Sequence, residues 1–343
     1  MADYPPVRVA MIGVGGIAAM HLTNLLRMPE AQVVGLADVD ANRISMTLRR
    51  AAAVQTPSIE PPDVPAFDDA GDMINSVGPD AVILALPPFA HGEAEFQCLE
   101  ADLPMLVQKP VGLDMQTVRG IEQGIAERGL ITAVGYQARY SQAADVARSM
   151  LADRPIGMAV GTYFGGLPDS PWWRVQAKSG GQVVEQATHV VDLQRYVVGE
   201  IETVHAVAAT RLMTDVENLD VADVSVATLV FENGAVGTLL NSIGLNGVPQ
   251  EPWGHGLTLV ARDLWFRVWT DGGRIATAGE TRELVNREDS KYLLDEAFVK
   301  AVASGDPSGI RSTYTDAVLT LRATLAINES ARTGDSVRVA DLG

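Results

Sequence analysis

The fold is decided by the stretch Val7–Ala18, which reads VRVAMIGVGGIA. Its first half, Val7–Ile12, is mostly apolar and has the length of a short buried strand. A glycine-rich turn follows at once, and a helical pattern begins near Ala18. The stretch therefore predicts a strand, a tight turn and a helix in immediate succession.

The turn carries G-x-G-x-x-A, a variant of the dinucleotide-binding fingerprint, at the junction where that motif functions. Gly13 permits the tight turn, Gly15 lets the backbone approach a pyrophosphate, and Ala18 allows the helix to pack closely. Gly16 and Ile17 complete the turn. The helix N-terminus then offers amide donors to the phosphates. A glycine turn without a ligand is the alternative interpretation.

An acidic residue ends the second apolar run, VVGLAD, which closes with Asp38, 20 residues after Ala18. A carboxylate there accepts hydrogen bonds from a ribose hydroxyl and repels a 2′-phosphate, so we expect NAD rather than NADP. Arg43 nearby is the alternative, because a guanidinium can pair with that phosphate.

From this stretch to about residue 135, short apolar runs alternate with helical patterns, as in a parallel sheet with crossover helices. The expected strands are Val7–Ile12, Val33–Ala37, Ala81–Leu86, Met105–Gln108 and Ile131–Val134. Helices are expected to begin near Ala18, Ala41, Asp69, His91 and Asp114. We therefore assign residues 1–135 to an α/β, doubly wound Rossmann domain that binds NAD(P).

After an expected helix at 138–152 the pattern changes to strands rich in Val, Thr and aromatic residues. The turn dipeptides Asn233-Gly234 and Asp271-Gly272 indicate hairpins. The expected strands are 157–164, 203–211, 222–232, 235–243, 257–261, 264–270 and 273–278, with helices at 183–198, 291–303 and 314–332. Residues 136–343 are thus expected to form a second α/β domain with a large, mostly antiparallel sheet.

Two expected strands of the first domain end in polar or turn residues, at the sheet edge where doubly wound folds bind ligands. Leu86 ends one strand, Pro87 follows it, and His91 opens the next helix. Gln108 ends another strand, and Lys109 follows it. A lone histidine at a helix start often packs or caps, and most lysines are solvated. A lysine beside a cofactor could instead hydrogen-bond a substrate oxygen or exchange a proton with it.

The helix expected at 183–198 places polar side chains one or two turns apart: Glu185, His189, Asp192 and Tyr196. Such a stripe can be a solvated face. It can also be catalytic, because alcohol oxidation needs a proton acceptor, and the Glu185 carboxylate, one turn away, can orient the imidazole of His189. Upstream, Trp173 and Arg174 are either core residues or groups that stack on and hydrogen-bond a sugar ring.

Composition excludes several classes of function. With 43 acidic and 26 basic residues the formal net charge is −17, which repels nucleic acids and anionic membranes. The sequence has no long apolar run, no export signal at its N-terminus and a single cysteine, Cys98, so we expect a cytoplasmic protein. Because His and Cys do not cluster, we also expect no metal site.

Taken together, these motifs resemble the Gfo/Idh/MocA oxidoreductases, the glucose–fructose oxidoreductase and inositol dehydrogenase family. The segments that carry the resemblance are GVGGIAAMHL, LPPFAHGE, VQKPVGLD, GYQARYSQA and VVEQATHVVDLQRYVVGE, in this order. The family pattern is a Rossmann domain followed by a domain whose sheet serves substrate binding and oligomer contacts.

The resemblance implies catalytic roles for Lys109, His189 and Glu185, and a substrate contact for Asp192. It also implies that Gln137 contacts the cofactor. Gln108 stands where the family has a glutamate, and Glu185 is one methylene longer than the usual aspartate.

The activity implied is hydride transfer between NAD and a secondary alcohol of a sugar or cyclic polyol, by a dehydrogenase that forms a homodimer or homotetramer. Two alternatives stay open. One is glycoside cleavage without net redox, through transient oxidation. The other is a non-catalytic NAD-binding regulator.

Overall fold

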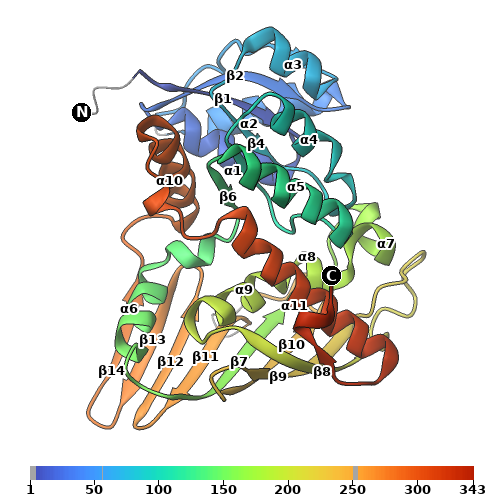
Figure 1. Cartoon of the computed structure of the whole chain (residues 1–343), viewed down its shortest axis with the longest axis vertical. Coiled ribbons are helices and arrows are strands. Elements are labelled where there is room, and N and C mark those ends of the chain that lie inside the picture. The colour runs from blue at the N-terminus through green and yellow to red at the C-terminus, as the bar shows by residue number, and fades with distance from the viewer. Residues whose placement is uncertain (1–4, 56, 250–253) are drawn as a thin grey trace. The chain divides into compact units, whose positions relative to one another are not determined.

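A computed structural model describes residues 5–55, 57–249 and 254–343 (Figure 1). By their contacts, the residues form two compact units. The first comprises Met1–Gly135 and Lys291–Asp316, and the second Tyr136–Ser290 and Ala317–Gly343. The expected boundary at 135/136 falls between the units. The segment Lys291–Asp316, assigned from sequence to the second domain, belongs by its contacts to the first unit.

The first unit is built on a six-stranded parallel sheet in the order β3-β2-β1-β4-β5-β6. The strands are β1 (Val7–Ile12), β2 (Ala31–Ala37), β3 (Ala66–Phe67), β4 (Ala81–Leu84), β5 (Met105–Val107) and β6 (Thr132–Val134). This is the Rossmann order, in which the strand order reverses between β1 and β4 and leaves a crevice at their carboxyl ends.

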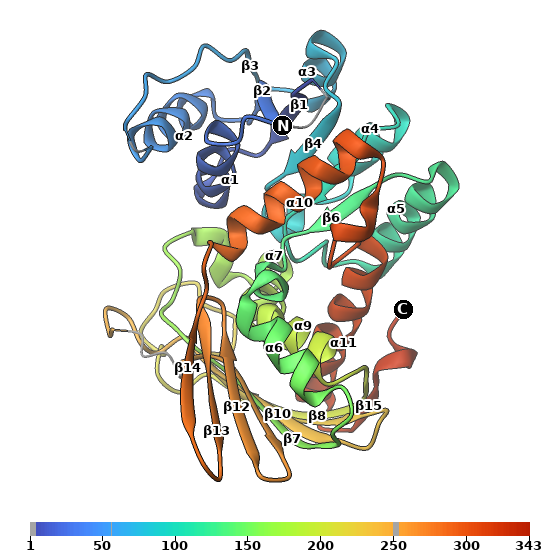
Figure 2. The ribbon, with the colours of Figure 1, turned by 90° about the vertical axis from the view of Figure 1, so that its left-hand side faces the viewer.

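Helices cover both faces of this sheet, with α1 and α2 on one side and α3, α4 and α5 on the other (Figure 2). The helices are α1 (Gly16–Leu26), α2 (Ala41–Ala53), α3 (Ala70–Val77), α4 (Glu93–Glu100), α5 (Met115–Arg128) and α10 (Ser290–Ser304), with a 3-10 turn η1 (Pro88–Ala90). Asp40, Asp69 and Asp114 cap α2, α3 and α5 by accepting backbone hydrogen bonds. The Rossmann assignment is thereby confirmed.

The second unit is built on a nine-stranded sheet in the order β14-β13-β12-β11-β7-β10-β9-β8-β15. The strands are β7 (Ile156–Phe164), β8 (Ile201–Ala209), β9 (Val224–Phe231), β10 (Val236–Ser242), β11 (His255–Ala261), β12 (Leu264–Trp269), β13 (Gly272–Thr277), β14 (Thr281–Val285) and β15 (Val337–Arg338). Among these described strands, only the β7–β10 pair is parallel. The sheet is therefore mixed and mostly antiparallel, as the sequence predicted, and both expected hairpins form.

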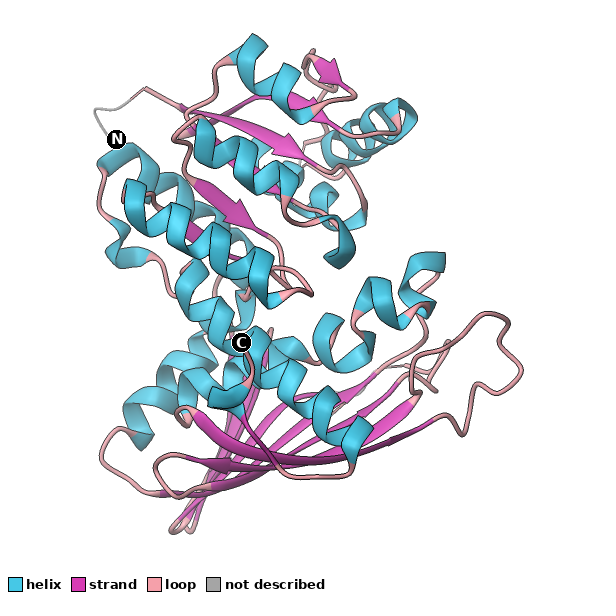
Figure 3. Cartoon of the chain, turned by 45° about the vertical axis from the view of Figure 1, so that its right-hand side comes forward, coloured by secondary structure: helices cyan, strands magenta, loops and turns pink. Residues whose placement is uncertain are grey.

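Helices lie over one face of the large sheet (Figure 3). They are α6 (Gln142–Leu151), α7 (Gln176–Ser179), α8 (Gly181–Glu185), α9 (Thr188–Val197) and α11 (Tyr314–Thr333), with 3-10 turns η2 (Gln137–Tyr140), η3 (Pro171–Arg174) and η5 (Val339–Asp341). The remaining 3-10 turn, η4 (Pro307–Gly309), belongs to the first unit. Alternate strand residues such as Leu229, Leu239 and Phe266 form the core beneath them. Burial of this apolar face is the main stabilising contribution to the unit.

In the part of the chain that the structure describes, no helix is both long and apolar enough to cross a membrane.

Candidate functional site

The turn after β1 has the geometry that its glycines predicted. Gly13 has φ +80°, and a Cβ there would lie 2.6 Å from the carbonyl oxygen of Ala85, so only glycine fits. Added Cβ atoms at Gly15 and Gly16 would meet no atom within 4 Å, so open space borders the start of α1. Ala18 is fully buried. Backbone amides beside open space at a helix N-terminus fit the pyrophosphate of NAD.

Ile17 is 40% exposed and borders the same turn. Asp38 lies directly after β2, and its Oδ2 accepts a hydrogen bond of 2.7 Å from the backbone N–H of Val14. Arg43 is exposed on α2 and forms a surface ion pair with Asp40 at 3.5 Å. Asp38 is therefore held at the glycine turn, whereas Arg43 is engaged on the surface.

Leu86 and Pro87 lie half-buried in the loop after β4. His91 precedes α4 rather than opening it, and its side chain is 1% exposed. Its Nδ1 is 2.5 Å from Glu95 Oε1, while Glu95 Oε2 accepts a hydrogen bond from the amide of Gly92. Burial raises the pKa of Glu95, but His91 and the Gly92 amide outweigh it and bring that pKa below its ordinary value. The pair stabilises the start of α4.

Lys109 is half-buried and is the second residue after β5. The neighbouring Gln108 belongs to a buried polar network that pattern reasoning missed. The Gln108 side-chain amide donates to His21 Nε2 at 2.6 Å, and His21 Nδ1 donates to Asp295 Oδ1 at 2.7 Å. Asn24 donates to the other oxygen of Asp295 at 2.7 Å. Gln108 thus links the strand end that carries Lys109 to α1 and α10.

The expected single helix at 183–198 is wrong, because it is broken between Glu185 and Thr188. The amide of Ala187 bonds to the carbonyl of Gln182, five residues back, instead of the carbonyl four residues back. This widened turn ends α8, and α9 begins at Thr188. Glu185 and His189 are therefore not one regular turn apart on a common helix.

Glu185 is half-buried, and its Oε2 accepts a hydrogen bond of 2.7 Å from the indole N–H of Trp173. Trp173 is 1% exposed and packs with Val221 and Ile243. Burial raises the pKa of Tyr163, and the charge of Glu185 raises it further. Trp173 is therefore fixed in an apolar cluster, and its hydrogen bond orients the carboxylate of Glu185. The sequence interpretation did not include Tyr163.

His189 is half-buried and lies edge-to-face with Tyr136, with ring centroids 6.0 Å apart. The hydroxyl of Tyr136 is 2.9 Å from Thr188 Oγ1, so it holds the first residue of α9. Gln137 follows at the half-buried start of η2. Pattern reasoning also missed Tyr136, although it lies within the quoted segment GYQARYSQA.

Asp192 is fully buried and accepts two hydrogen bonds from Arg139, at 2.8 and 2.6 Å, and one from Thr320 at 3.0 Å. The Arg139 guanidinium also lies over the ring of Tyr196, 4.9 Å from its centroid. Asp192, which belongs to the predicted polar stripe, therefore forms an internal ion pair with Arg139 and does not lie on a solvated face. Asp192 therefore anchors α9 in its unit.

Arg174, the other predicted substrate contact, lies half-buried at the end of η3.

Comparisons with known proteins agree with this architecture. The family model described as "Oxidoreductase family, NAD-binding Rossmann fold" matches residues 7–136, and the Gfo/Idh/MocA C-terminal domain matches residues 146–276. The chain is 23% identical over 322 residues to the myo-inositol 2-dehydrogenase of Thermotoga maritima, covering 89% of this chain and 90% of that protein. It is 24% identical to the D-glucoside 3-dehydrogenase of Escherichia coli, covering 97% and 98%.

Among solved structures, a levoglucosan dehydrogenase in complex with NADH superposes with a TM-score of 0.83 at 20% identity, covering 97% of this chain and 99% of that one. This likeness shows the fold. The two matched domains confirm the expected cofactor, NAD, and the expected class of oxidoreductase. The chain belongs to the Gfo/Idh/MocA family of oxidoreductases, and its first domain is that family's NAD-binding Rossmann domain.

Proposed function

We propose that the protein is an NAD-dependent dehydrogenase that oxidises a secondary alcohol of a sugar or cyclic polyol to a ketone. The observation that carries the proposal is the break between α8 and α9. It presents two half-buried ionisable side chains, Glu185 and His189, each held by a buried aromatic neighbour. Partly buried, fixed acid–base groups at a distorted helix are typical of catalytic sites.

His189 is the proposed general base. It takes the hydroxyl proton as the carbinol carbon loses a hydride, because an imidazole exchanges protons near neutral pH. When bound, NAD supplies the acceptor for that hydride. Tyr136 fixes the imidazole through its ring edge, and Glu185 receives a second hydroxyl of the substrate. The polar groups thus orient the substrate before reaction.

Lys109 is the proposed hydrogen-bond donor to the reacting oxygen. It lies at the carboxyl edge of the parallel sheet, where doubly wound folds bind their ligands. The Gln108–His21–Asp295 network holds the preceding residue rigidly. Asp192 is proposed to act through α9, since Arg139 and Thr320 occupy its carboxylate.

The relatives support a cyclic polyhydroxyl substrate, since two of them are named for dehydrogenation of an inositol and of a glucoside. A screen of NADH formation across inositols, aldoses and methyl glycosides tests the proposal. We expect turnover with at least one class and a ketone product by mass spectrometry. Absence of NADH formation with every class, in protein that binds NAD, would contradict it.

We further propose that the protein works in the cytoplasm as a homodimer or homotetramer. The single, buried cysteine supports a cytoplasmic location. Size-exclusion chromatography with light scattering measures the oligomeric state.

A further inference from the structure

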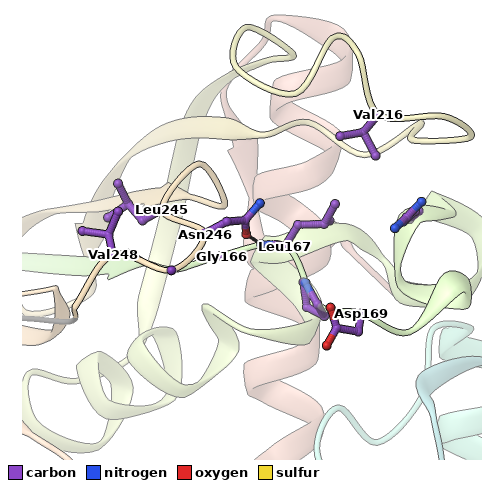
Figure 4. A pocket seen from close by; sticks show the side chains of 10 residues that line it. Gly166, Leu167, Asp169, Val216, Leu245, Asn246 and Val248 are labelled. Carbon is purple, nitrogen blue, oxygen red and sulfur yellow. Dashed lines mark hydrogen bonds between the residues drawn. The ribbon is translucent and has the colours of Figure 1, made fainter.

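Three loops of the second unit enclose a pocket with a volume of about 700 Å³, which we call the loop pocket (Figure 4). They are the segment after β7, the long connection between β8 and β9, and the segment after β10. The lining residues are Gly166, Leu167, Pro168, Asp169, Arg174, Val216, Leu245, Asn246, Gly247 and Val248. The volume lies within the range of small-molecule sites.

Direct hydrogen bonds hold two of these loops together. Asn246 Oδ1 accepts a hydrogen bond of 2.7 Å from the backbone N–H of Leu167, and the N–H of Leu245 donates to Gly165 at 2.9 Å. A Cβ at Gly166 would lie 2.6 Å from Asn246 Oδ1, so any larger residue there would displace the Asn246 side chain. The loop pocket is therefore formed by specific contacts before any ligand binds.

The lining mixes apolar walls with a few polar groups. Leu167, Val216 and Val248 supply apolar surface, and Asp169 supplies a carboxylate (Figure 4). The Nε atom of Arg174 is buried and has no hydrogen-bond partner among the described residues, and its Nη1 is 3.5 Å from the carbonyl of Glu217. The guanidinium of Arg174, which lines the pocket, carries further N–H groups that can donate to a ligand oxygen.

These groups select for a particular ligand chemistry. The charges of Asp169 and Arg174 offset each other, so the lining has no net attraction for an anion or a cation. A sugar ring has apolar C–H faces together with hydroxyls that both donate and accept. Such a ring satisfies a carboxylate, a guanidinium and apolar walls at once.

The loop pocket is close to the proposed reaction centre along the chain. Arg174 lines the pocket, and the preceding residue, Trp173, donates its indole hydrogen bond to Glu185. Neighbouring Cα atoms are about 3.8 Å apart, so the pocket wall and the support of Glu185 belong to one short segment.

We propose that the loop pocket is a subsite for a second sugar ring, and that the substrate is a disaccharide or related glycoside rather than a free cyclitol or monosaccharide. The proposal rests on the proposed function for the ring that is oxidised. It adds that the ring that does not react supplies binding free energy through Asp169, Arg174 and the apolar walls.

Kinetics with maltose, cellobiose and lactose beside methyl α- and methyl β-glucoside test this subsite. At least one disaccharide should show a kcat/KM about tenfold above that of the better methyl glucoside, mainly through KM, which corresponds to about 1.4 kcal/mol. Val216→Phe fills the pocket and Asp169→Asn removes its carboxylate charge. Both should remove most of this advantage and leave the methyl glucosides unchanged.

Val207→Phe is the matched control, because Val207 is 65% exposed on β8 and does not line the pocket. Equal kcat/KM for one- and two-ring sugars in the unaltered protein would overturn the subsite. An equal loss of kcat/KM for one- and two-ring sugars in Val216→Phe would also overturn it. A change in the solution mass of that variant would do the same, because it would make the pocket a contact between copies of the chain.

Calorimetry with the same sugars in the presence of NADH separates this proposal from the proposed function. Disaccharide binding that Val216→Phe abolishes, without oxidation of any sugar, would retain the subsite and refute the dehydrogenase. Oxidation of a methyl glucoside, with no tighter binding of any disaccharide, would retain the dehydrogenase and refute the subsite.

Discussion

The indole N–H of Trp173 donates a hydrogen bond of 2.7 Å to Oε2 of Glu185. Trp173 is 1% exposed, so this bond is shielded from water and directs a half-buried carboxylate. The bond joins the segment after β7 to the end of α8. It makes the carboxylate a fixed group, as orientation of a substrate requires.

Trp173→Phe should lower kcat/KM about tenfold, because it removes the only donor that the indole offers to Glu185. The smaller ring also leaves a cavity, so the free energy of unfolding should fall by about 1–3 kcal/mol. Steady-state kinetics and urea unfolding measure the two effects. Trp265→Phe, on the exposed face of β12, is the control and should change neither. Unaltered kinetics in Trp173→Phe would refute the orienting role of the indole.

Asp192→Ala should destabilise the protein by about 3–5 kcal/mol, because Arg139 would keep a buried charge without its carboxylate. The exposed pair Arg332–Glu329 provides the comparison, and Glu329→Gln should leave stability unchanged within error. Chemical denaturation of both variants measures the contrast. A stable Asp192→Ala protein with poor turnover would instead show that Asp192 contacts the substrate.

Glu95→Gln should reduce the loss of stability in acid. Since the folded-state pKa of Glu95 lies below its ordinary value, its charged form stabilises the protein above the unfolded-state pKa, about 4.3. That stabilisation is lost as the pH falls from about 5 through the folded-state pKa. Denaturation curves at a series of pH values should show that the variant is less stable at neutral pH and that the difference narrows in acid. If the stability of the two proteins changed in parallel across this pH range, the acid-dependent loss of stability would not come from Glu95.

Lys109→Ala should lower kcat by about 10²–10⁴-fold while the dissociation constant for NADH changes little, because the lysine is proposed to bond the reacting oxygen. Single-turnover kinetics and calorimetry with NADH separate the two effects. Lys300→Ala, at an exposed position of α10, is the matched control. Near-normal turnover of Lys109→Ala would remove this lysine from the proposed mechanism.

The cofactor turn was predictable because its determinants are local. Gly13, Gly15 and Ala18 are required by the geometry of one turn, and Asp38 follows the next strand at the spacing of the fingerprint. The βα alternation likewise predicted the parallel sheet, and two turn dipeptides predicted hairpins of the second sheet. The short strand β14, by contrast, carries no alternation of buried and exposed residues and was missed.

The local sequence around Gln186 and Ala187 contains no proline or glycine, so its apolar period predicted one continuous helix. The break depends on a backbone bond from Ala187 to Gln182 and on the packing around it. The sequence predicted a substrate contact for Asp192, or a place on a solvated helix face, for the same reason. Its partners Arg139 and Thr320 are 53 and 128 residues away, and burial by such distant segments leaves no trace in a helical pattern.

The loops at 166–174 and 244–248 showed no periodicity that could place them side by side, and Val216 showed no signal at all. Spacing along a chain encodes turns, helices and strands, because these depend on near neighbours. Which side chains then become buried, paired or aligned along a pocket depends on contacts between segments far apart in the chain, and those exist only in the folded molecule.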